Sequence, residues 1–478
     1  MGRRRLFDRT VSRSCAAWTL LLVLASAPAA GQDVRHFDRS AVDAVFAAYN
    51  RSDAPGCAVG VVHDGTLVYG RGYGMANLEH GIAISPQTVF RTGSVGKQFT
   101  AAAIAIAARD GHISLDDPVR RWILELPAYP AEPTVRQAVH HTSGLRDYLT
   151  LMSLRGLRDD DYYTIAEVRA LIARQEELNF EPGSEYLYSN SGYFLLGEIV
   201  REATGRSLRA YAQKEIFEPL GMTHTHFHDD HTHIVPNRAA GYAPTQTGFR
   251  ISQTTLDMVG DGGVFTSVED LVRWIDALNT DGLRPGLNAV LESTDPLTGG
   301  EENPYAFGQS LGTYRGARTI RHGGSFVGFR AAIARFPDHG LGIATLCNRS
   351  DSDPSTLSMR VADAVLGELL EPAASEAVRG VTAQPEAGEA AHFVTDVAPF
   401  VGTFYSTELD VSYVLRSDAE DGRLRLGFGP DFDAPVELVE PDLLRAGPLQ
   451  LRIVREGGRV VGFDVDAGRV QNLRFNRR

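Results

Sequence analysis

Short strand-like runs of apolar residues, bounded by turn residues, lie at both ends of residues 36–371, whereas the middle of this segment has helical spacing. Near its start, two strand-like runs are joined by Asp64-Gly65, a strong hairpin signal. Near its end, two further runs flank the turn 337–340. Strands at both ends with helices between them predict an α/β (α+β) fold: an antiparallel sheet flanked by helices, plus an all-helical subdomain. The four runs are 57–62, 66–70, 326–336 and 341–347.

Helix starts in this segment carry capping patterns, in which a serine or threonine is followed three residues later by an acidic residue. The pairs are Ser40 with Asp43, Thr164 with Glu167, and Ser267 with Asp270. The glycine-rich stretch 261–266 does not follow a dinucleotide-binding strand, and we therefore expect a tight turn there. The clearest helical stretches are 40–49, 98–109, 193–203 and 354–370.

The pattern changes after residue 371. Residues 371–392 are rich in Ala, Glu, Gly and Pro without a periodic apolar face, which is typical of a linker. From 401 to 475 short alternating runs are separated by turns, and they predict a small antiparallel barrel or sandwich. Because small barrels are commonly filled by their own side chains, we favour a packing or substrate-gating role for it over ligand carriage. The runs are 402–405, 409–415, 423–428, 436–439, 443–446, 449–455, 460–465 and 470–475.

The first thirty residues have the layout of an export signal: a basic start, a short apolar core and small residues at 27–31. We therefore expect export to the periplasm or secretion, with a retained N-terminal anchor as the alternative. No later segment is apolar for long enough to predict a membrane span in the mature chain. The predicted domains are a signal peptide (1–30), a first folded domain (31–371), a linker (372–392) and the barrel (393–478).

The chain of 478 residues has a formal net charge of −13, which becomes more negative when five arginines and Asp8 leave with residues 1–30. This charge argues against nucleic acid or anionic lipid as a partner. The mature chain would keep two cysteines, Cys57 and Cys347, each in a strand-like apolar run. We expect two buried thiols, although export would permit one bridge between them.

Ser94 and Lys97 stand three residues apart at the start of an apolar helical run, so their side chains point the same way. An amine beside a hydroxyl can take its proton, and the helix N-terminus favours a developing oxyanion. Lysine is rare in this chain: apart from Lys97 only Lys214 occurs, and the other basic residues are arginine. Since arginine does not deprotonate in proteins and lysine can, Lys97 is a candidate for a titratable base.

Three motifs in order, Ser94-Val95-Gly96-Lys97, Tyr188-Ser189-Asn190 and His322-Gly323-Gly324-Ser325, resemble those of the class C β-lactamase and penicillin-binding serine hydrolase family. The segments 141–145 and 181–183 strengthen this resemblance, which covers about 36–371. The family includes D-aminopeptidases, D-alanyl-D-alanine carboxypeptidases and many esterases. Residues 393–478 are similar to the lipocalin-like domain attached to some members.

The resemblance implies a role for each motif residue. Ser94 would attack a carbonyl carbon and form an acyl-enzyme, Lys97 would assist its deprotonation, and Tyr188 would act as base or proton shuttle. Asn190 would hydrogen-bond Lys97 or the substrate amide. The backbone N–H groups of Ser94 and Ser325 would form the oxyanion hole, and Gly323 and Gly324 would let the substrate approach the strand closely. No cofactor is implied.

His322 departs from the β-lactamase pattern, in which a lysine usually holds the β-lactam carboxylate. A histidine is mostly neutral near pH 7, which argues against efficient β-lactam hydrolysis and favours the esterase and aminopeptidase branches. A dense histidine cluster at 224–233 lacks a recognised metal-binding spacing, and we expect no catalytic metal.

The sequence therefore predicts an exported serine hydrolase acting through a Ser94 acyl-enzyme on a small-molecule or peptide ester or amide. The alternatives are a D-aminopeptidase or D-alanyl-D-alanine carboxypeptidase acting on peptidoglycan-type peptides, and a penicillin-binding module with little turnover. A ligand-carrying barrel beside an inert hydrolase domain would require broken motifs, and the motifs are intact.

Overall fold

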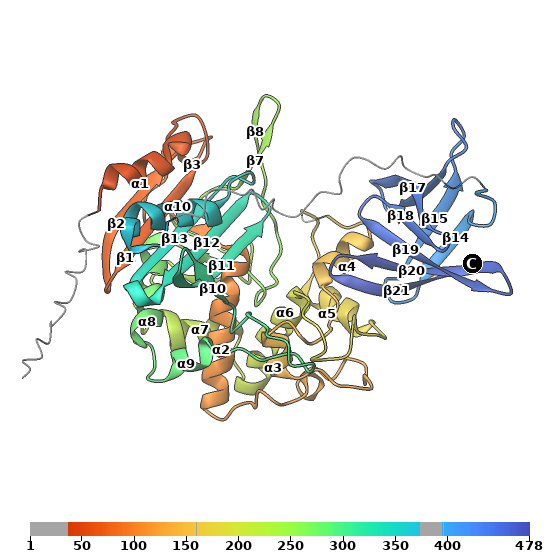
Figure 1. Cartoon of the computed structure of the whole chain (residues 1–478), viewed down its shortest axis with the longest axis horizontal. Coiled ribbons are helices and arrows are strands. Elements are labelled where there is room, and N and C mark those ends of the chain that lie inside the picture. The colour runs from red at the N-terminus through yellow and green to blue at the C-terminus, as the bar shows by residue number, and fades with distance from the viewer. Residues whose placement is uncertain (1–36, 159, 373–393, 395) are drawn as a thin grey trace, which may run out of the picture. The chain divides into compact units, whose positions relative to one another are not determined.

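The computed structural model of the protein describes residues 37–158, 160–372, 394 and 396–478 (Figure 1). Val34–Arg478 forms one compact unit. The predicted signal peptide lies outside the described residues, and so does all of the predicted linker except residue 372.

A six-stranded antiparallel sheet forms the centre of the first domain, in the order β10-β11-β12-β13-β1-β2. Strand β1 pairs with β13, which follows almost three hundred residues later, and β2 pairs with β1, so the two ends of the segment close one sheet, as the strand-like runs predicted. The bounds are β1 (Cys57–His63), β2 (Thr66–Tyr73), β10 (Ser310–Tyr314), β11 (Ala317–Phe326), β12 (Phe329–Phe336) and β13 (Leu341–Cys347).

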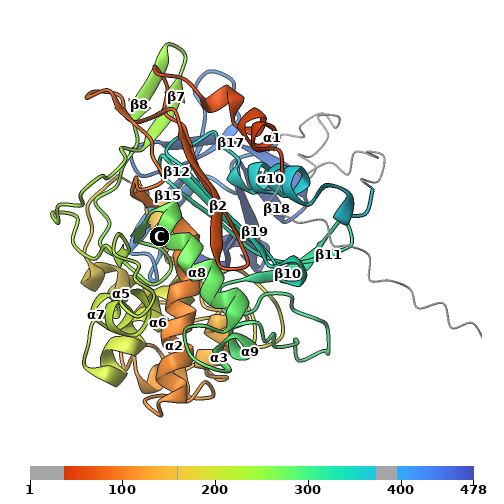
Figure 2. The ribbon, with the colours of Figure 1, turned by 90° about the vertical axis from the view of Figure 1, so that its left-hand side faces the viewer.

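Both faces of this sheet are covered. Along β1 every residue is buried because successive side chains enter two different hydrophobic cores: Ala58 and Val62 one, Val59 and Val61 the other. Helix α8 (Val268–Thr280) packs on one face, and α1 (Arg39–Val45) with α10 (Pro354–Leu366) belongs to the other core (Figure 2).

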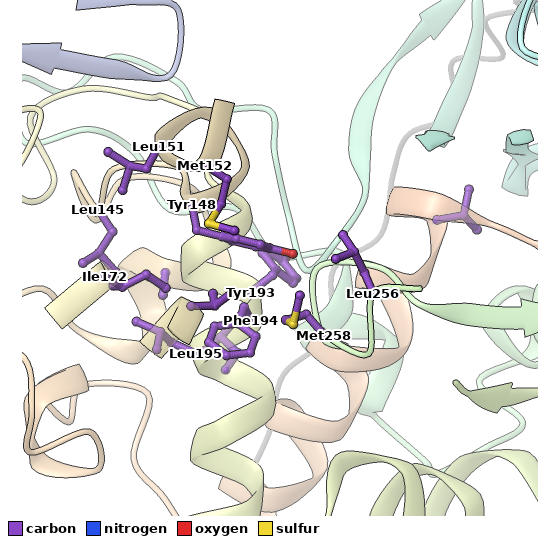
Figure 3. Close-up of a cluster of buried hydrophobic side chains, with 14 of the residues drawn as sticks. Leu145, Tyr148, Leu151, Met152, Ile172, Tyr193, Phe194, Leu195, Leu256 and Met258 are labelled. Carbon is purple, nitrogen blue, oxygen red and sulfur yellow. The ribbon is translucent and has the colours of Figure 1, made fainter. Parts of the chain in front are cut away.

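The helical subdomain lies between β5 (Phe90–Arg91) and β9 (Val264–Thr266) in the chain. Its first helix, α2 (Lys97–Arg109), is buried from Lys97 to Ala107, as an apolar helix in the middle of a domain should be. Beside it, Tyr148 from α4 packs against Phe194 from α6 with 5.8 Å between ring centroids (Figure 3). The other helices of the domain are α3 (Val135–Val139), α4 (Tyr148–Leu154), α5 (Ile165–Ala173), α6 (Asn190–Thr204), α7 (Leu208–Ala212) and α9 (Leu287–Leu291).

Short strands complete the first domain, and 3-10 and π turns extend several helices. The strands are β3 (Met75–Asn77), β4 (Ile82–Ala83), β6 (His226–Phe227), β7 (Tyr242–Thr245) and β8 (Gly248–Ile251). The turns are η2 (Ala47–Tyr49), η3 (Gly93–Gly96), η4 (Val119–Arg121), η5 (Gln213–Phe217), η6 (Pro337–His339) and η7 (Gly367–Leu369).

The capping predictions had mixed outcomes. Thr164 and Glu167 form the predicted reciprocal capping box of α5, and Ser267 caps α8 by accepting from Asp270 N. The predicted capping pair of Ser40 and Asp43 was wrong. Asp38 caps α1 instead, and the carboxylate of Asp43 accepts hydrogen bonds from tyrosine hydroxyls of β2.

The C-terminal domain is a closed antiparallel barrel of eight strands, which confirms the predicted barrel. Its own aromatic rings lie in its interior: Tyr413 stacks on Phe428 at 4.0 Å between ring centroids and packs at a tilt against Phe475 at 4.2 Å. The strands are β14 (Gly402–Ser406), β15 (Val411–Ser417), β16 (Leu424–Phe428), β17 (Phe432–Glu440), β18 (Leu443–Ala446), β19 (Leu449–Glu456), β20 (Arg459–Ala467) and β21 (Val470–Arg477).

Cys57 and Cys347 form a disulfide, so the expectation of two thiols was wrong. The two residues are direct partners in the β1–β13 register. The sequence shows both strands but not that they are neighbours, and this pairing decides whether the sulfur atoms meet. Among the described residues, no helix is both long and apolar enough to cross a membrane.

Candidate active site

Ser94 lies in the 3-10 turn η3, which leads directly into α2 at Lys97. The turn is pressed against the end of β11. A Cβ atom on Gly93, whose φ is +52°, would lie 2.8 Å from the backbone nitrogen of Ser325. One on Gly324 would lie 1.9 Å from the Thr92 carbonyl oxygen and 3.1 Å from the Ser94 nitrogen. Glycine at both positions therefore brings the backbone N–H groups of Ser94 and Ser325 to the same place.

The Lys97 side chain is completely buried at the end of this turn. Its Nζ lies 3.3 Å from Ser94 Oγ and 2.7 Å from Asn190 Oδ1, and it also donates to the Asp261 carbonyl oxygen. Burial lowers the pKa of Lys97 to about 8, the nearby Asp261 and Asp147 carboxylates oppose that shift, and Arg469 adds to it. Lys97 is thus close to half-neutral at mildly alkaline pH.

A neutral lysine has two N–H donors and one lone pair. With Asn190 Oδ1 and the Asp261 carbonyl as acceptors for the two donors, the lone pair is left for Ser94 Oγ. The contacts of Lys97 therefore suit an amine that accepts the serine proton.

Two buried carboxylates that sequence reasoning missed support this arrangement. Asp147 accepts from the backbone N–H groups of Asn190, at 2.7 Å, and Thr150, at 3.0 Å, so it caps α4 and fixes the start of α6. Asp261 accepts from the Tyr148 hydroxyl at 3.0 Å, and burial raises its pKa. The only local signal for Asp147 is its place after a turn-rich segment and before an apolar run.

Tyr188 places its ring 4.8 Å from Lys97 Nζ. Its hydroxyl oxygen is buried and has no hydrogen-bond partner among the described residues, although the Ser94 hydroxyl lies near enough to lower its pKa. Burial is the larger effect and raises the pKa of Tyr188 well above its ordinary value. The phenol therefore keeps its proton at neutral pH and can donate it.

His141 accepts a hydrogen bond from Ser189 N at Nδ1 over 3.1 Å. Its ring also packs against the Tyr188 ring at 4.1 Å between centroids. Because Nδ1 accepts, the proton of the neutral ring is on Nε2. His141 thus orients the segment that carries Tyr188 and Asn190.

Both ring nitrogens of His322 are occupied by protein groups. Nδ1 lies 2.6 Å from the Gly323 carbonyl oxygen, which can only accept, so Nε2 accepts from the Tyr305 hydroxyl at 2.9 Å. Burial, with a smaller contribution from Lys97, lowers the pKa of His322 to about 4. His322 is therefore a neutral residue of the site at neutral pH.

The predicted residues meet in one cleft of about 470 Å³. Ser94, Tyr188, Asn190 and the strand edge 322–325 all line it, whereas Lys97 lies beneath Ser94. Arg469 from the C-terminal barrel lines the same cleft, and nothing in the local sequence signalled it. The other lining residues are Arg91, Gly93, Tyr148, Leu149, Leu256, Met258, Asp261, Gly262, Gly263, Phe326, Arg330, Ala331, Ser352, Asp353, Pro354 and Ser355.

The histidine cluster lies elsewhere in the chain's fold. His226 Nε2 is 3.2 Å from His228 Nδ1, whereas His231 pairs with Asp257. Within the described ranges, no group of three or more His, Cys, Asp or Glu side chains is arranged to hold a metal ion.

The sequence profile of the Beta-lactamase family matches residues 42–368. The D-aminopeptidase of Gluconobacter oxydans (strain 621H) is 30% identical over 336 residues, which are 70% of this chain and 63% of that protein. The chain thus spans less than two thirds of this relative.

Among solved structures, the octameric penicillin-binding protein homologue from Pyrococcus abyssi superposes with a TM-score of 0.60 at 23% identity, over 91% of this chain and 98% of that one. The crystal structure of SurE with D-Leu gives 0.58 at 25% identity, over 92% and 100%. These superpositions confirm the expected fold class, and the profile match to residues 42–368 confirms the β-lactamase family resemblance expected from the motifs.

Proposed function

Because this chain belongs to the Beta-lactamase family, we propose that it is a serine hydrolase that cleaves amides or esters through an acyl-enzyme on Ser94. The observation that carries the proposal is the buried Lys97 amine, with its Nζ 3.3 Å from Ser94 Oγ and its other contacts fixed by Asn190 and Asp261. Burial lowers the pKa of Lys97 to about 8, which favours the neutral amine that this role requires.

In the first half-reaction, neutral Lys97 takes the proton of Ser94 as Oγ attacks the carbonyl carbon. The oxyanion is stabilised by the N–H groups of Ser94 and Ser325. The leaving amine or alcohol takes a proton from the Tyr188 hydroxyl, which Lys97 can then reprotonate. In the second half-reaction, water attacks the ester carbon and gives a proton to neutral Lys97. The bond between the acyl carbon and Ser94 Oγ then breaks, and Oγ takes a proton from Lys97, directly or through Tyr188, so that the acid leaves and Ser94 is restored.

For the substrate, we propose the amides and esters of D-amino acids. The support is the similarity to a relative named D-aminopeptidase and to the crystal structure of SurE with D-Leu. The runner-up is an esterase without this stereochemical preference. A penicillin-binding module that acylates without turnover is the third candidate.

We also propose export, on the basis of the layout of residues 1–30 and of the Cys57–Cys347 disulfide. Such bridges persist mainly in oxidising compartments.

Intact-mass spectrometry after exposure to a fluorophosphonate tests the nucleophile. We expect one adduct on the wild type and none on Ser94→Ala, and 4-nitrophenyl acetate turnover should follow the same pattern. Ser355→Ala is the matched control, because Ser355 lines the cleft but has no contact with Lys97, and it should still be labelled. An unlabelled wild type, or labelling that survives in Ser94→Ala, would refute the proposal.

The substrate class needs a second comparison, with the 4-nitroanilides of D-alanine and L-alanine. Faster release from the D form supports the D-amino-acid proposal, and equal rates favour the esterase alternative. A stable penicilloyl adduct without release of either anilide or ester would identify the penicillin-binding alternative.

A further inference from the structure

Arg469 brings a cation from the barrel into the cleft of Ser94. It follows Gly468, whose φ of +60° makes the turn between β20 and β21. Its guanidinium carbon lies 4.7 Å from the centroid of the Tyr188 ring, and its side chain is 45% exposed. A group in the cleft next to Ser94 and Tyr188 is therefore within reach of this guanidinium.

The turn that carries Arg469 is fixed on both sides to the helical subdomain. Asn179 donates from Nδ2 to the Arg469 carbonyl at 3.0 Å and accepts from Gln471 N at Oδ1 over 2.8 Å. Asp147 N also donates to the Arg469 carbonyl, at 3.4 Å. The backbone of the turn is thus positioned as firmly as that of a strand pair.

A buried ion pair holds the same hairpin. Arg146 donates to Glu408 Oε1 at 2.7 Å, and their side chains are 0% and 7% exposed. Arg146 also donates to the carbonyl oxygens of Gln471 and Asn472. Separating these domains would expose or strand a buried charge, which is costly. These contacts together hold the turn that carries Arg469 at the cleft wall.

The guanidinium of Arg469 has unused donors. It makes no hydrogen bond to any residue in the described ranges, and its ion-pair partner, Asp147 Oδ2, is 3.9 Å away and already accepts from Asn190 N. The planar fork of arginine donors matches a carboxylate in a bidentate geometry.

The other charged groups that line the cleft contact protein groups. Arg91 is buried against the rings of Phe265 and Phe326 and donates to the Leu256 carbonyl oxygen at 3.4 Å, although its Nε has no partner among the described residues. Arg330 donates to backbone carbonyl oxygens. Of the carboxylates, Asp261 is buried and accepts from Tyr148, and Asp353 caps α10.

We propose that Arg469 binds a carboxylate of the substrate, so that the preferred amide or ester carries a negative charge near the bond that Ser94 attacks. This inference rests on the proposed function and narrows its substrate class. Because the barrel supplies the residue, the barrel takes part in substrate selection.

The test compares matched neutral and anionic esters. On the acyl side these are 4-nitrophenyl 4-methylbenzoate and 4-nitrophenyl 4-carboxybenzoate; on the leaving-group side they are 4-nitrophenyl acetate and 3-carboxy-4-nitrophenyl acetate. The readout is the anionic-to-neutral ratio of kcat/KM for the wild type, Arg469→Gln, Arg469→Lys and Arg469→Glu. Arg445→Gln is the control, because Arg445 is a barrel arginine of equal exposure, 46%, paired with Glu437.

We expect Arg469→Gln to lower the ratio about 10- to 100-fold on at least one side, mainly through KM, as for loss of a hydrogen bond to a charged group. Arg469→Lys should restore part of the anionic-to-neutral ratio, and Arg469→Glu should lower this ratio further. Arg445→Gln should leave the ratio unchanged. The inference is overturned if the wild type and Arg469→Gln have equal anionic-to-neutral ratios of kcat/KM for both the acyl-side and the leaving-group-side ester pairs. If fluorophosphonate labelling and hydrolysis of 4-nitrophenyl acetate persist in that case, the proposed function stands; if the wild type shows neither, the proposed function fails first.

Discussion

Asp147 accepts a hydrogen bond from the backbone N–H of Asn190 over 2.7 Å, and thereby fixes the residue that holds the Lys97 amine. Asp147 is also the N-cap of α4 and the nearest carboxylate to Arg469. One buried side chain thus joins the helical subdomain, the base of the proposed reaction and the barrel.

Asp147→Ala should therefore destabilise the protein more than the loss of an ordinary cap. It removes a helix cap and leaves the buried Asn190 N–H without its acceptor, which together cost about 2–4 kcal/mol. The measurement is urea denaturation followed by circular dichroism. Asp353→Ala is the control, because it removes only the cap of α10 and should cost about 1 kcal/mol. Equal losses in the two variants would contradict the double role of Asp147.

The pH dependence of catalysis should report the protonation of Lys97. Its pKa is lowered from 10.5 to about 8, and only the neutral amine can take the Ser94 proton. The value of kcat/KM for a neutral ester should therefore rise with pH and level off above about 8. His322, with its pKa lowered to about 4, should add no limb between pH 5.5 and 7.5. A limb near 6.5 that disappears in His322→Gln would show instead that this histidine titrates in catalysis.

The buried ion pair between Arg146 and Glu408 should be essential for the barrel's attachment. Arg146→Met leaves the Glu408 carboxylate buried without its partner, and such losses cost about 3–5 kcal/mol. Arg146→Met with Glu408→Gln should be less damaging than Arg146→Met alone, because no charge is then stranded. Denaturation midpoints of both variants provide the measurement, and Arg445→Gln, at an exposed pair, should change stability by less than about 1 kcal/mol. If Arg146→Met is as stable as Arg445→Gln, the interface between the barrel and the first domain does not depend on the Arg146–Glu408 ion pair.

Reduction of the Cys57–Cys347 bridge should lower stability. The bridge joins residues separated by 290 positions, and closing so long a loop restricts the unfolded chain by about 2–5 kcal/mol. Wild-type protein should unfold at lower urea concentration with dithiothreitol, whereas Cys57→Ala with Cys347→Ala should be insensitive to it. If dithiothreitol does not change the urea concentration at which the wild type unfolds, the disulfide does not stabilise the protein.

Local patterns in the sequence were enough for much of this protein. Short strand-like runs bounded by turns predicted β1, β2, β12 and β13, and alternating runs predicted the barrel strands. Both patterns are local because successive residues of a strand point to opposite faces of the sheet. The spacing of Ser94 and Lys97 is a local helical property, and the three motifs identified the family and the residues of the cleft.

Only the tertiary structure decided which distant segments meet. The Cys57–Cys347 disulfide depends on β1 lying beside β13. The Asp43 carboxylate accepts hydrogen bonds from tyrosines of β2 and does not cap a helix. Arg469 reaches Tyr188 because the interface between the two domains places its turn there. The lowered pKa values of Lys97 and His322 arise from burial, which no single stretch of sequence specifies. Chain composition sets which groups can titrate or pair, and packing sets their neighbours and the water they lose.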